Sequence, residues 1–220
     1  MALTESRMVE LGTEAPAFEL MDVISGKVIG RDDLSALAWD DDLSDAANRS
    51  TQGGPKRKHG LLVMFVCAHC PYVVHVEQEL GRIGRDYFGA NGPIAIAAIQ
   101  PNDIAAHPDD GPDGMRAQAK RSGWNFPYLL DELQEVARAY DAACTPDFFL
   151  FDAEMKLVYR GQLDDSRPRR GDESGDSTPV TGKDLRAALD AVIAGKRPDP
   201  NQRYGVGCSI KWRNHSEARA

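Results

Sequence analysis

The hydrophobic pattern of the chain is clearest between residues 61 and 87. Residues 61–66 form an unbroken apolar run that is too short for a helix and is typical of a buried strand. After a break, apolar residues recur at spacings of three and four, which predicts one face of an amphipathic helix. These residues are Val73, Val76, Leu80, Ile83 and Tyr87. Pro71 fits the first turn of this helix, because a proline there has its φ already set and lacks only an amide that would be unpaired anyway.

A second apolar run, 94–100, follows a turn at Asn91-Gly92-Pro93 and predicts another buried strand. Strand, helix and strand in this order make a βαβ unit. The two strands should therefore be parallel neighbours in one sheet.

The flanking segments predict further elements around this unit. They are a β-hairpin over 13–30, a short helix over 34–39, helices over 115–122, 133–140 and 183–194, a short strand over 128–130, and a hairpin that pairs 148–151 with 157–160. The polar segment 40–58 predicts a mobile insertion, 101–114 and 161–182 predict loops, and 196–220 is a C-terminal tail with little periodicity. We therefore predict a single α/β domain over 1–220, with a central sheet flanked by helices.

Composition narrows the possible partners. The formal net charge of −8 argues against nucleic acid or an anionic membrane as the main partner, because such binding depends on clustered basic residues. The one basic cluster, Lys56-Arg57-Lys58, is short, and we expect it to be a solvated loop. No signal-peptide core or bilayer-spanning run is visible, so the expected compartment is the cytoplasm.

The break at 67–70 carries the candidate chemistry. Its sequence is Cys67-Ala68-His69-Cys70, a CxxC motif between the predicted strand and helix. The helix dipole favours negative charge at a helix N-terminus, so we expect Cys67 to be the thiol that ionises more easily. A protonated His69 between the sulfurs would stabilise the thiolate further. Because a thiolate is the attacking species in thiol-disulfide exchange, the motif predicts a redox centre, with Cys67 as a surface thiol that contributes little packing.

Two other interpretations of the cysteines remain open at this stage. A CxxC motif can be half of a structural zinc site, but Cys144 and Cys208 stand singly and do not form a second half. The two motif cysteines could also be inert core residues. A cytoplasmic location favours the redox interpretation, since thiols are kept reduced there. We expect no cofactor and no metal.

Several sequence strings resemble one known family. They are CAHCPYV, NFPYLLDE, CTPDFFLFD, KLVYRGQLDDSRP and GCSIKW. In this order they resemble the peroxiredoxin-like redoxin (AhpC/TSA-type) branch of the thioredoxin superfamily, over roughly residues 12–212. The resemblance implies a thioredoxin-like fold with a mixed sheet, an N-terminal β-hairpin and a C-terminal extension. It also implies thiol-disulfide oxidoreductase activity on protein or small-molecule disulfides and dithiols.

Site residues follow from the resemblance by position. Cys67 would be the nucleophile, Cys70 the resolving thiol, and Thr145-Pro146 a cis-proline element facing them. Cys144 should then lie near the site, and Cys208 could pair with it as an auxiliary redox pair or remain independent. Thioredoxins usually keep a buried carboxylate on the strand before the motif, but 59–66 has none, so the proton acceptor for Cys70 is not identified.

The sequence also allows two functions other than disulfide exchange. A thiol peroxidase of the usual PxxxTxxC type needs a threonine and a proline where this chain has Met64 and Gly60. A Cu(I)-handling protein is suggested by the similarity of CxxCP to the CxxxCP motif of copper-delivery members of the same fold, since thiolates select Cu(I). The spacing is one residue shorter, however, and no particular distant histidine is identified as a third ligand. His107, in the loop 101–114, is expected to face solvent rather than to take part in catalysis.

Overall fold

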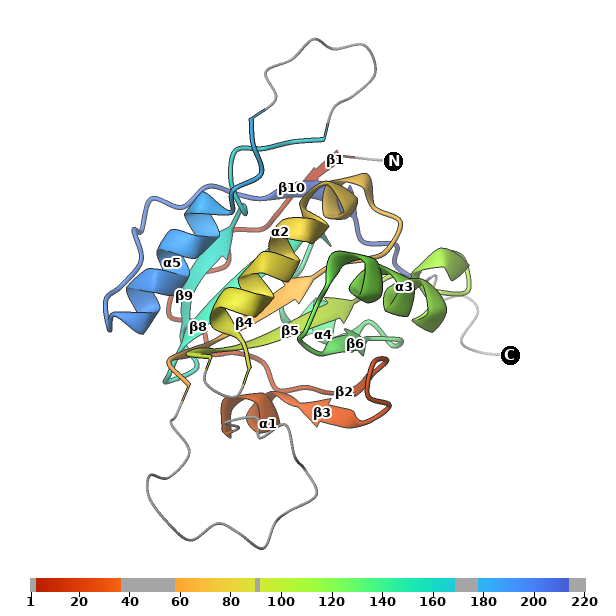
Figure 1. The fold of residues 1–220 in the computed structure, drawn as a ribbon, viewed down its shortest axis with the longest axis horizontal. Helices are drawn as coiled ribbons and strands as arrows, with labels where there is room; N and C mark the ends of the chain where they lie inside the picture. Colours follow the sequence, from red (N-terminus) through yellow and green to blue (C-terminus); the bar gives the residue numbers. More distant parts are fainter. Residues whose placement is uncertain (1–2, 37–57, 90–91, 169–177, 214–220) are drawn as a thin grey trace, which may run out of the picture.

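A seven-stranded mixed sheet forms the centre of the computed structural model (Figure 1). The structure describes residues 3–36, 58–89, 92–168 and 178–213. Its strands are ordered β3-β2-β6-β5-β4-β8-β9. β4 is parallel to β5, and β5 to β6, whereas β8 is antiparallel to β4. The predicted βαβ unit is therefore present at the middle of the sheet.

The helices and strands have the following bounds. They are β1 Leu3–Glu5, β2 Glu19–Asp22, β3 Val28–Gly30, α1 Arg31–Ala36, β4 Gly60–Phe65, α2 Pro71–Tyr87, β5 Ile94–Gln100, the 3₁₀ helix η1 Pro108–Asp110, α3 Pro112–Ser122, β6 Tyr128–Leu130, α4 Glu135–Ala139, β7 Cys144–Thr145, β8 Asp147–Asp152, β9 Leu157–Gly161, α5 Lys183–Ile193 and β10 Val206–Ser209.

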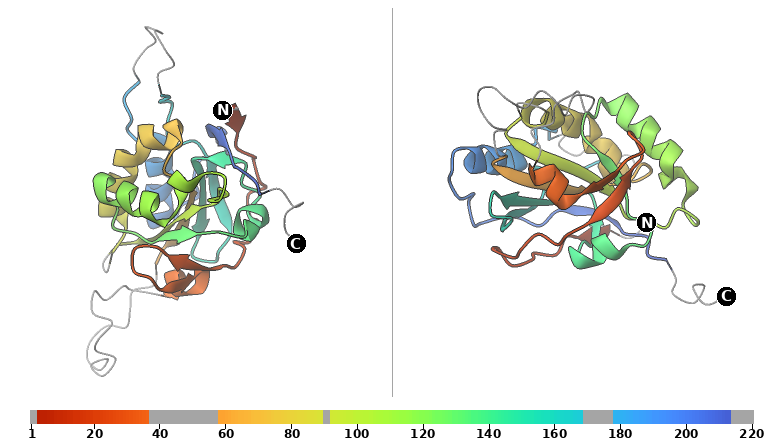
Figure 2. Two further views of the ribbon diagram at one scale, coloured as in Figure 1. Left: turned by 90° about the vertical axis from the view of Figure 1, so that its right-hand side faces the viewer. Right: turned by 90° about the horizontal axis from the view of Figure 1, so that it is seen from below.

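Helices cover both faces of the sheet, so the central strands are buried on each side (Figures 1 and 2). Alternate residues of β4 point to opposite faces, as the pleat requires. Leu62 and Met64 pack with residues of α2, α3 and α5. Leu61 and Val63 pack with residues of α1 and α4 on the other face. This two-sided burial explains why the strand sequences are continuously apolar rather than alternating.

The predicted hairpins are present, and their turns have clear causes. β2 and β3 pair antiparallel within 13–30, and Gly26 in their turn has a φ of 72°, which favours glycine. β8 and β9 form the second hairpin. The short helix predicted over 34–39 begins earlier, at Arg31. There the Asp33 carboxylate accepts a hydrogen bond from the Gly30 amide at 2.9 Å and caps the helix start.

The C-terminal tail contains a strand that the sequence pattern did not predict. β10 pairs antiparallel with both β1 and β7 in a separate three-stranded sheet. Gly207 makes this pairing possible, because a Cβ at that position would lie 2.1 Å from the Thr145 carbonyl oxygen. The strand was missed because only four residues take part and their partners are distant in sequence.

The predicted insertion 40–58 lies outside the described residues except for its last residue, Lys58. The solvated loop expected for the basic cluster does not extend to Lys58, which is buried. Its ammonium group donates hydrogen bonds to the carbonyl oxygens of Gly89 and Gly92, at 2.7 and 2.6 Å. These bonds tie the start of β4 to the end of α2. Across the described ranges, no helix combines the length and hydrophobicity needed to span a bilayer.

Asp147, at the start of β8, is a buried carboxyl group at the edge of this framework. Oδ2 accepts a hydrogen bond from the Ala143 amide at 3.3 Å, whereas Oδ1 has no partner among the described residues. Burial raises the pKa of Asp147 to about 8. The native state therefore holds a proton here that the unfolded chain releases near its ordinary pKa of 3.8.

The variant Asp147→Asn tests this buried proton. Between pH 3.8 and about 8 the carboxyl group is protonated in the folded state and ionised in the unfolded state. The free energy of unfolding of the wild type therefore falls as pH rises through this range. We expect the free energy of unfolding of the variant to rise relative to the wild type between pH 5 and 8, by at most about 1.4 kcal/mol per pH unit. Urea denaturation at several pH values measures this difference. Asp113→Asn, at an exposed carboxylate, is the control. A difference independent of pH for Asp147→Asn would contradict the assignment.

Candidate active site

The CxxC motif occupies the turn between β4 and α2. The Val66 amide still donates to the Ile99 carbonyl oxygen at 2.9 Å, so the sheet holds the chain up to the residue before Cys67. Cys70 is the N-cap of α2 and has extended backbone angles, with Pro71 as the first helical residue. The helix start predicted from the sequence is therefore present, but the residue at the cap is Cys70 rather than Cys67.

Both sulfurs lie against the Thr145–Pro146 segment, whose peptide bond is cis. Cys67 Sγ is 3.3 Å from Thr145 Oγ1, and Cys70 Sγ is 3.2 Å from the Thr145 carbonyl oxygen. Both cysteines have an exposed fraction of 0%. The expectation of a surface thiol at Cys67 is therefore wrong, because Thr145 and the residues around the turn cover it.

The electrostatics of the two thiols also differ from the expectation. Hydrogen bonding from the Cys67 thiol lowers the pKa of Cys70 to about 5, against the opposing effect of burial, and the Cys208 thiol and the Val73 amide contribute in the same direction. The same hydrogen bond, together with burial, raises the pKa of Cys67 well above its ordinary value. The resting negative charge therefore belongs to Cys70, because the donors at the helix start converge on its sulfur.

Asp110 supplies a buried carboxylate beside the motif, which 59–66 lacks. It lies in η1, in the loop after β5, and it is fully buried. Oδ1 accepts hydrogen bonds from the amides of Ala68 and His69, at 2.9 and 3.1 Å. Oδ2 contacts His69 Nδ1 at 2.5 Å and accepts a bond from Asn102 Nδ2 at 2.8 Å. Asp110 therefore holds the turn in place, and its charge contributes to the raised pKa of Cys67.

His107 is the second contribution from this loop. Its ring stacks on His69, with a centroid separation of 5.3 Å and an interplanar angle of 10°. The expectation that His107 simply faces solvent is therefore incomplete, because the residue is half-buried against the motif. The only sequence signal was a polar loop directly after a strand of the βαβ unit, where the carboxyl ends of parallel strands bring loops together.

A buried polar network supports the turn from below. Gln118, on α3, donates to the Cys67 carbonyl oxygen at 3.3 Å and to Glu77 Oε2 at 3.1 Å. Tyr128 donates its hydroxyl to Gln118 Oε1 at 2.9 Å. Arg121 forms two hydrogen bonds to the Glu77 carboxylate, at 2.9 and 2.8 Å. The network joins α2, α3 and β6 beneath the dithiol, and sequence reasoning did not identify it.

One group near the motif has the composition of a metal site. Ligand atoms of Cys67, His69 and Asp110 lie within 4.8 Å of one another. However, the Asp110 oxygens already take part in the four hydrogen bonds described above, which is about the capacity of a carboxylate. Binding of a cation would have to displace some of them. The arrangement therefore fits a positioning role for Asp110 better than a ligand role.

The remaining two cysteines lie on neighbouring strands, β7 and β10. In the register of this pair Cys208 is opposite Thr145, and Cys144 is opposite Ser209. Side chains alternate along a strand, so Cys144 and Cys208 lie on opposite faces. The Cys208 thiol hydrogen-bonds with Cys70, whereas the Cys144 thiol donates to the Pro146 carbonyl oxygen at 3.6 Å. Cys144 is therefore close to the site in sequence and space, but its side chain is not part of the thiol cluster.

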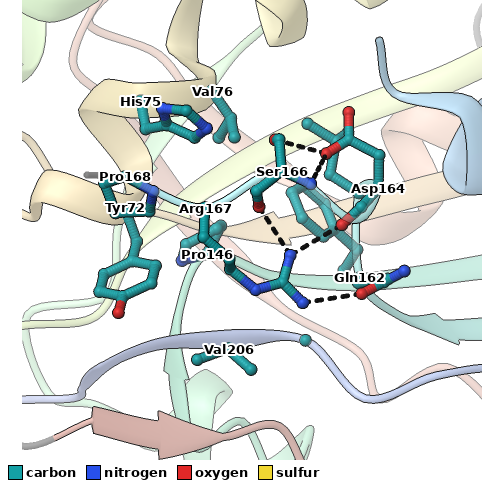
Figure 3. A pocket seen from close by; sticks show the side chains of 13 residues that line it. Tyr72, His75, Val76, Pro146, Gln162, Asp164, Ser166, Arg167, Pro168 and Val206 are labelled. Atoms are coloured by element: carbon teal, nitrogen blue, oxygen red, sulfur yellow. Dashed lines mark hydrogen bonds between the residues drawn. The ribbon is translucent and has the colours of Figure 1, made fainter. Parts of the chain in front are cut away.

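A small pocket lies beside Pro146 (Figure 3). Its volume of about 20 Å³ is enough for about one water molecule. The segment that closes it is fixed by Arg167, which donates hydrogen bonds to the carbonyl oxygens of Asp164 and Ser166 at 2.8 and 2.7 Å. His75 Nε2, at the helix side, has no partner among the described residues. No cysteine is among the residues that line this pocket.

Comparison with known proteins identifies the family of this chain. The Redoxin family model matches residues 10–175. The structure is similar to that of an uncharacterized conserved protein from Geobacillus kaustophilus, with 44% identity, 97% of each chain covered and a TM-score of 0.80. It is also similar to a hypothetical protein from Sinorhizobium meliloti 1021, with 39% identity, coverage of 96% and 98%, and a TM-score of 0.79.

A more distant structure confirms the fold. The thioredoxin domain of a thiol-disulfide oxidoreductase from Bacteroides vulgatus has 16% identity, with 69% of this chain and 88% of that chain covered and a TM-score of 0.50. No curated protein matches the chain. Because the family model covers most of the sequence and agrees with the thioredoxin-like sheet, the chain belongs to the Redoxin family.

Proposed function

We propose that this protein is a thiol-disulfide oxidoreductase that uses Cys67 and Cys70 as its redox pair. The observation that carries the proposal is the hydrogen-bonded pair of thiols against Thr145, with one sulfur at the start of α2. A buried pair that shares one negative charge is suited to thiol-disulfide exchange. Its substrates are protein or small-molecule disulfides in one direction and dithiols in the other.

The attack begins with a proton transfer inside the pair. Cys70 carries the resting charge, and its thiolate accepts the proton of Cys67 through the hydrogen bond between the two sulfurs. Thr145 favours this shifted state, because its hydroxyl can donate to the Cys67 thiolate and its carbonyl oxygen can accept the Cys70 proton. The Cys67 thiolate then attacks the substrate disulfide. A Cys67–substrate disulfide forms, and the other substrate sulfur leaves as a thiolate.

Resolution returns the charge to Cys70. The Cys70 thiol gives its proton to the departing substrate thiolate and then attacks Cys67 Sγ. The Cys67–Cys70 disulfide forms and the second substrate sulfur leaves as a thiolate, which takes a proton from solvent, so one substrate disulfide is reduced as one protein disulfide is made. The proton acceptor that the sequence could not identify is in this scheme the leaving thiolate.

A thiol peroxidase remains the alternative function, and one contact favours it. Thr145 Oγ1 lies beside Cys67, where a hydroxyl could hydrogen-bond to a bound peroxide. Against it, Met64, at the position of the peroxidase threonine, is fully buried in the apolar core. The Cu(I) alternative depends on the cysteines alone, and no feature of the site favours it over disulfide exchange.

Trapping identifies the attacking cysteine. With insulin as substrate, Cys70→Ser should accumulate a mixed disulfide on Cys67, because the resolving thiol is absent. Cys67→Ser should form none and should lose disulfide-reductase activity. Non-reducing electrophoresis followed by peptide mapping distinguishes the two. A mixed disulfide that accumulates in Cys67→Ser but not in Cys70→Ser would reverse the assigned roles.

Titration of the reduced protein locates the resting charge. Thiolate absorbance near 240 nm should rise with an inflection at about pH 5, the lowered pKa of Cys70. Cys70→Ser should lose this inflection. Cys67→Ser should keep much of it, because a serine hydroxyl can donate the same hydrogen bond. If no thiolate forms below pH 7 in the wild type, the proton transfer described above is wrong.

Substitutions of His69 and Asp110, which should shift the reduction potential in opposite directions, test whether this pair controls the potential. His69→Gln keeps the backbone amide that donates to Asp110, which a proline at this position would remove, but it loses the imidazole. An imidazolium at this position would favour a thiolate, so its loss should make the reduction potential more negative. Asp110→Asn removes the charge that raises the pKa of Cys67 and should shift the potential the other way. Each pKa unit corresponds to about 30 mV in equilibrium with glutathione. Shifts of the same sign would refute this electrostatic account.

A further inference from the structure

Cys208 lies in the active site although it is far from the motif in sequence. It is directly opposite Thr145 in the β7–β10 register, and side chains opposite each other share a face of the sheet. Thr145 directs its hydroxyl at Cys67 from this face. Cys208 accordingly belongs to the same buried cluster as Cys67 and Cys70, and its thiol interacts with that of Cys70. Cys70 thus interacts with both of the other thiols.

The strand that carries Cys208 is held firmly in this position. β10 lies between β1 and β7, so both of its edges are paired. The adjacent Gly207 packs so closely on the cis-proline segment that a Cβ there would lie 3.1 Å from the Pro146 nitrogen. Cys208 is almost completely buried, with an exposed fraction of 3%. Its contact with Cys70 is therefore set by backbone pairing rather than by a flexible tail.

We propose that Cys208 is a third redox-active thiol, which attacks Cys70 in the Cys67–Cys70 disulfide and leaves Cys67 as a free thiol in the oxidised protein. This inference rests on the proposed function. The Cys70–Cys208 bond forms as the Cys67–Cys70 bond breaks, the electron pair leaves on Cys67, and the Cys208 proton passes to the Cys67 thiolate. The number of disulfides is unchanged, so the exchange needs no oxidant beyond the original substrate disulfide.

Oxidation of the motif itself prepares Cys208 for this step. In the reduced protein, burial and then the hydrogen bond and charge of Cys70 raise the pKa of Cys208 to about 12. When Cys70 enters a disulfide, it loses its thiolate charge and no longer accepts a hydrogen bond as a thiolate. Of the three effects that raise the pKa of Cys208, only burial then remains. Cys208 therefore becomes more acidic when an adjacent disulfide is available for attack. Cys144 has no equivalent position, since its side chain lies on the opposite face of β7.

Disulfide mapping of the full chain tests the proposal. The reduced protein is treated with oxidised glutathione, quenched in acid, alkylated with N-ethylmaleimide and digested without reduction. In the wild type we expect peptides joined by Cys67–Cys70 and peptides joined by Cys70–Cys208. In the first form Cys208 is alkylated, and in the second form Cys67 is alkylated instead. Cys208→Ser should yield only the first disulfide. Cys144→Ser, which replaces a cysteine of similar burial, is the matched control and should yield both.

Two results separate failure of this inference from failure of the proposed function. If wild-type protein contains Cys67–Cys70 while Cys208 is fully alkylated, the third thiol is ruled out and the dithiol mechanism stands. If Cys67 and Cys70 join no intramolecular disulfide, the proposed function fails as well. Cys67→Ser treated with diamide gives an independent reading. A Cys70–Cys208 disulfide is expected there, and its absence in a variant with unchanged circular dichroism also overturns the proposal.

Discussion

The hydrogen bond between the Cys67 and Cys70 sulfurs is the interaction on which the site depends. Both groups are buried, and a buried pair of thiols in contact carries one charge far more easily than two. The helix start, the Val73 amide and the Cys208 thiol favour that charge on Cys70. Asp110 disfavours it on Cys67. The sulfur that accepts the hydrogen bonds carries the negative charge. Position in the CxxC sequence alone does not determine which sulfur this is.

Much of this arrangement could be predicted from local patterns. The apolar run before the motif and the helical periodicity after it located β4 and α2, because each pattern extends over consecutive residues in one element. The motif chemistry followed from that junction. The order of ionisation did not, although Pro71 was correctly placed in the first turn of α2. It depends also on Asp110 and Cys208, which are distant from the motif in sequence.

The contacts that sequence reasoning missed share a different property. Asp110, His107 and Cys208 lie in segments with weak periodicity, and their roles arise only from contacts with distant parts of the chain. Asp110 is supplied by the loop after β5, a neighbour of β4 in the sheet. A carboxylate from that loop can replace one from β4 because parallel strands end at the same edge. Such a substitution leaves no mark in the sequence around the motif.

The pairing of β1 with β10 has a consequence for the solubility of the protein. β1, Leu3–Glu5, is the outer strand of the small sheet and pairs with one edge of β10. The other edge of β10 pairs with β7. Without β1, the outward amides and carbonyls of Val206–Ser209 would become an open strand edge, which is a template for β-addition by another chain. Residues 3–5 thus cover one edge of the strand that carries Cys208, and their removal would open that edge to pairing with another chain.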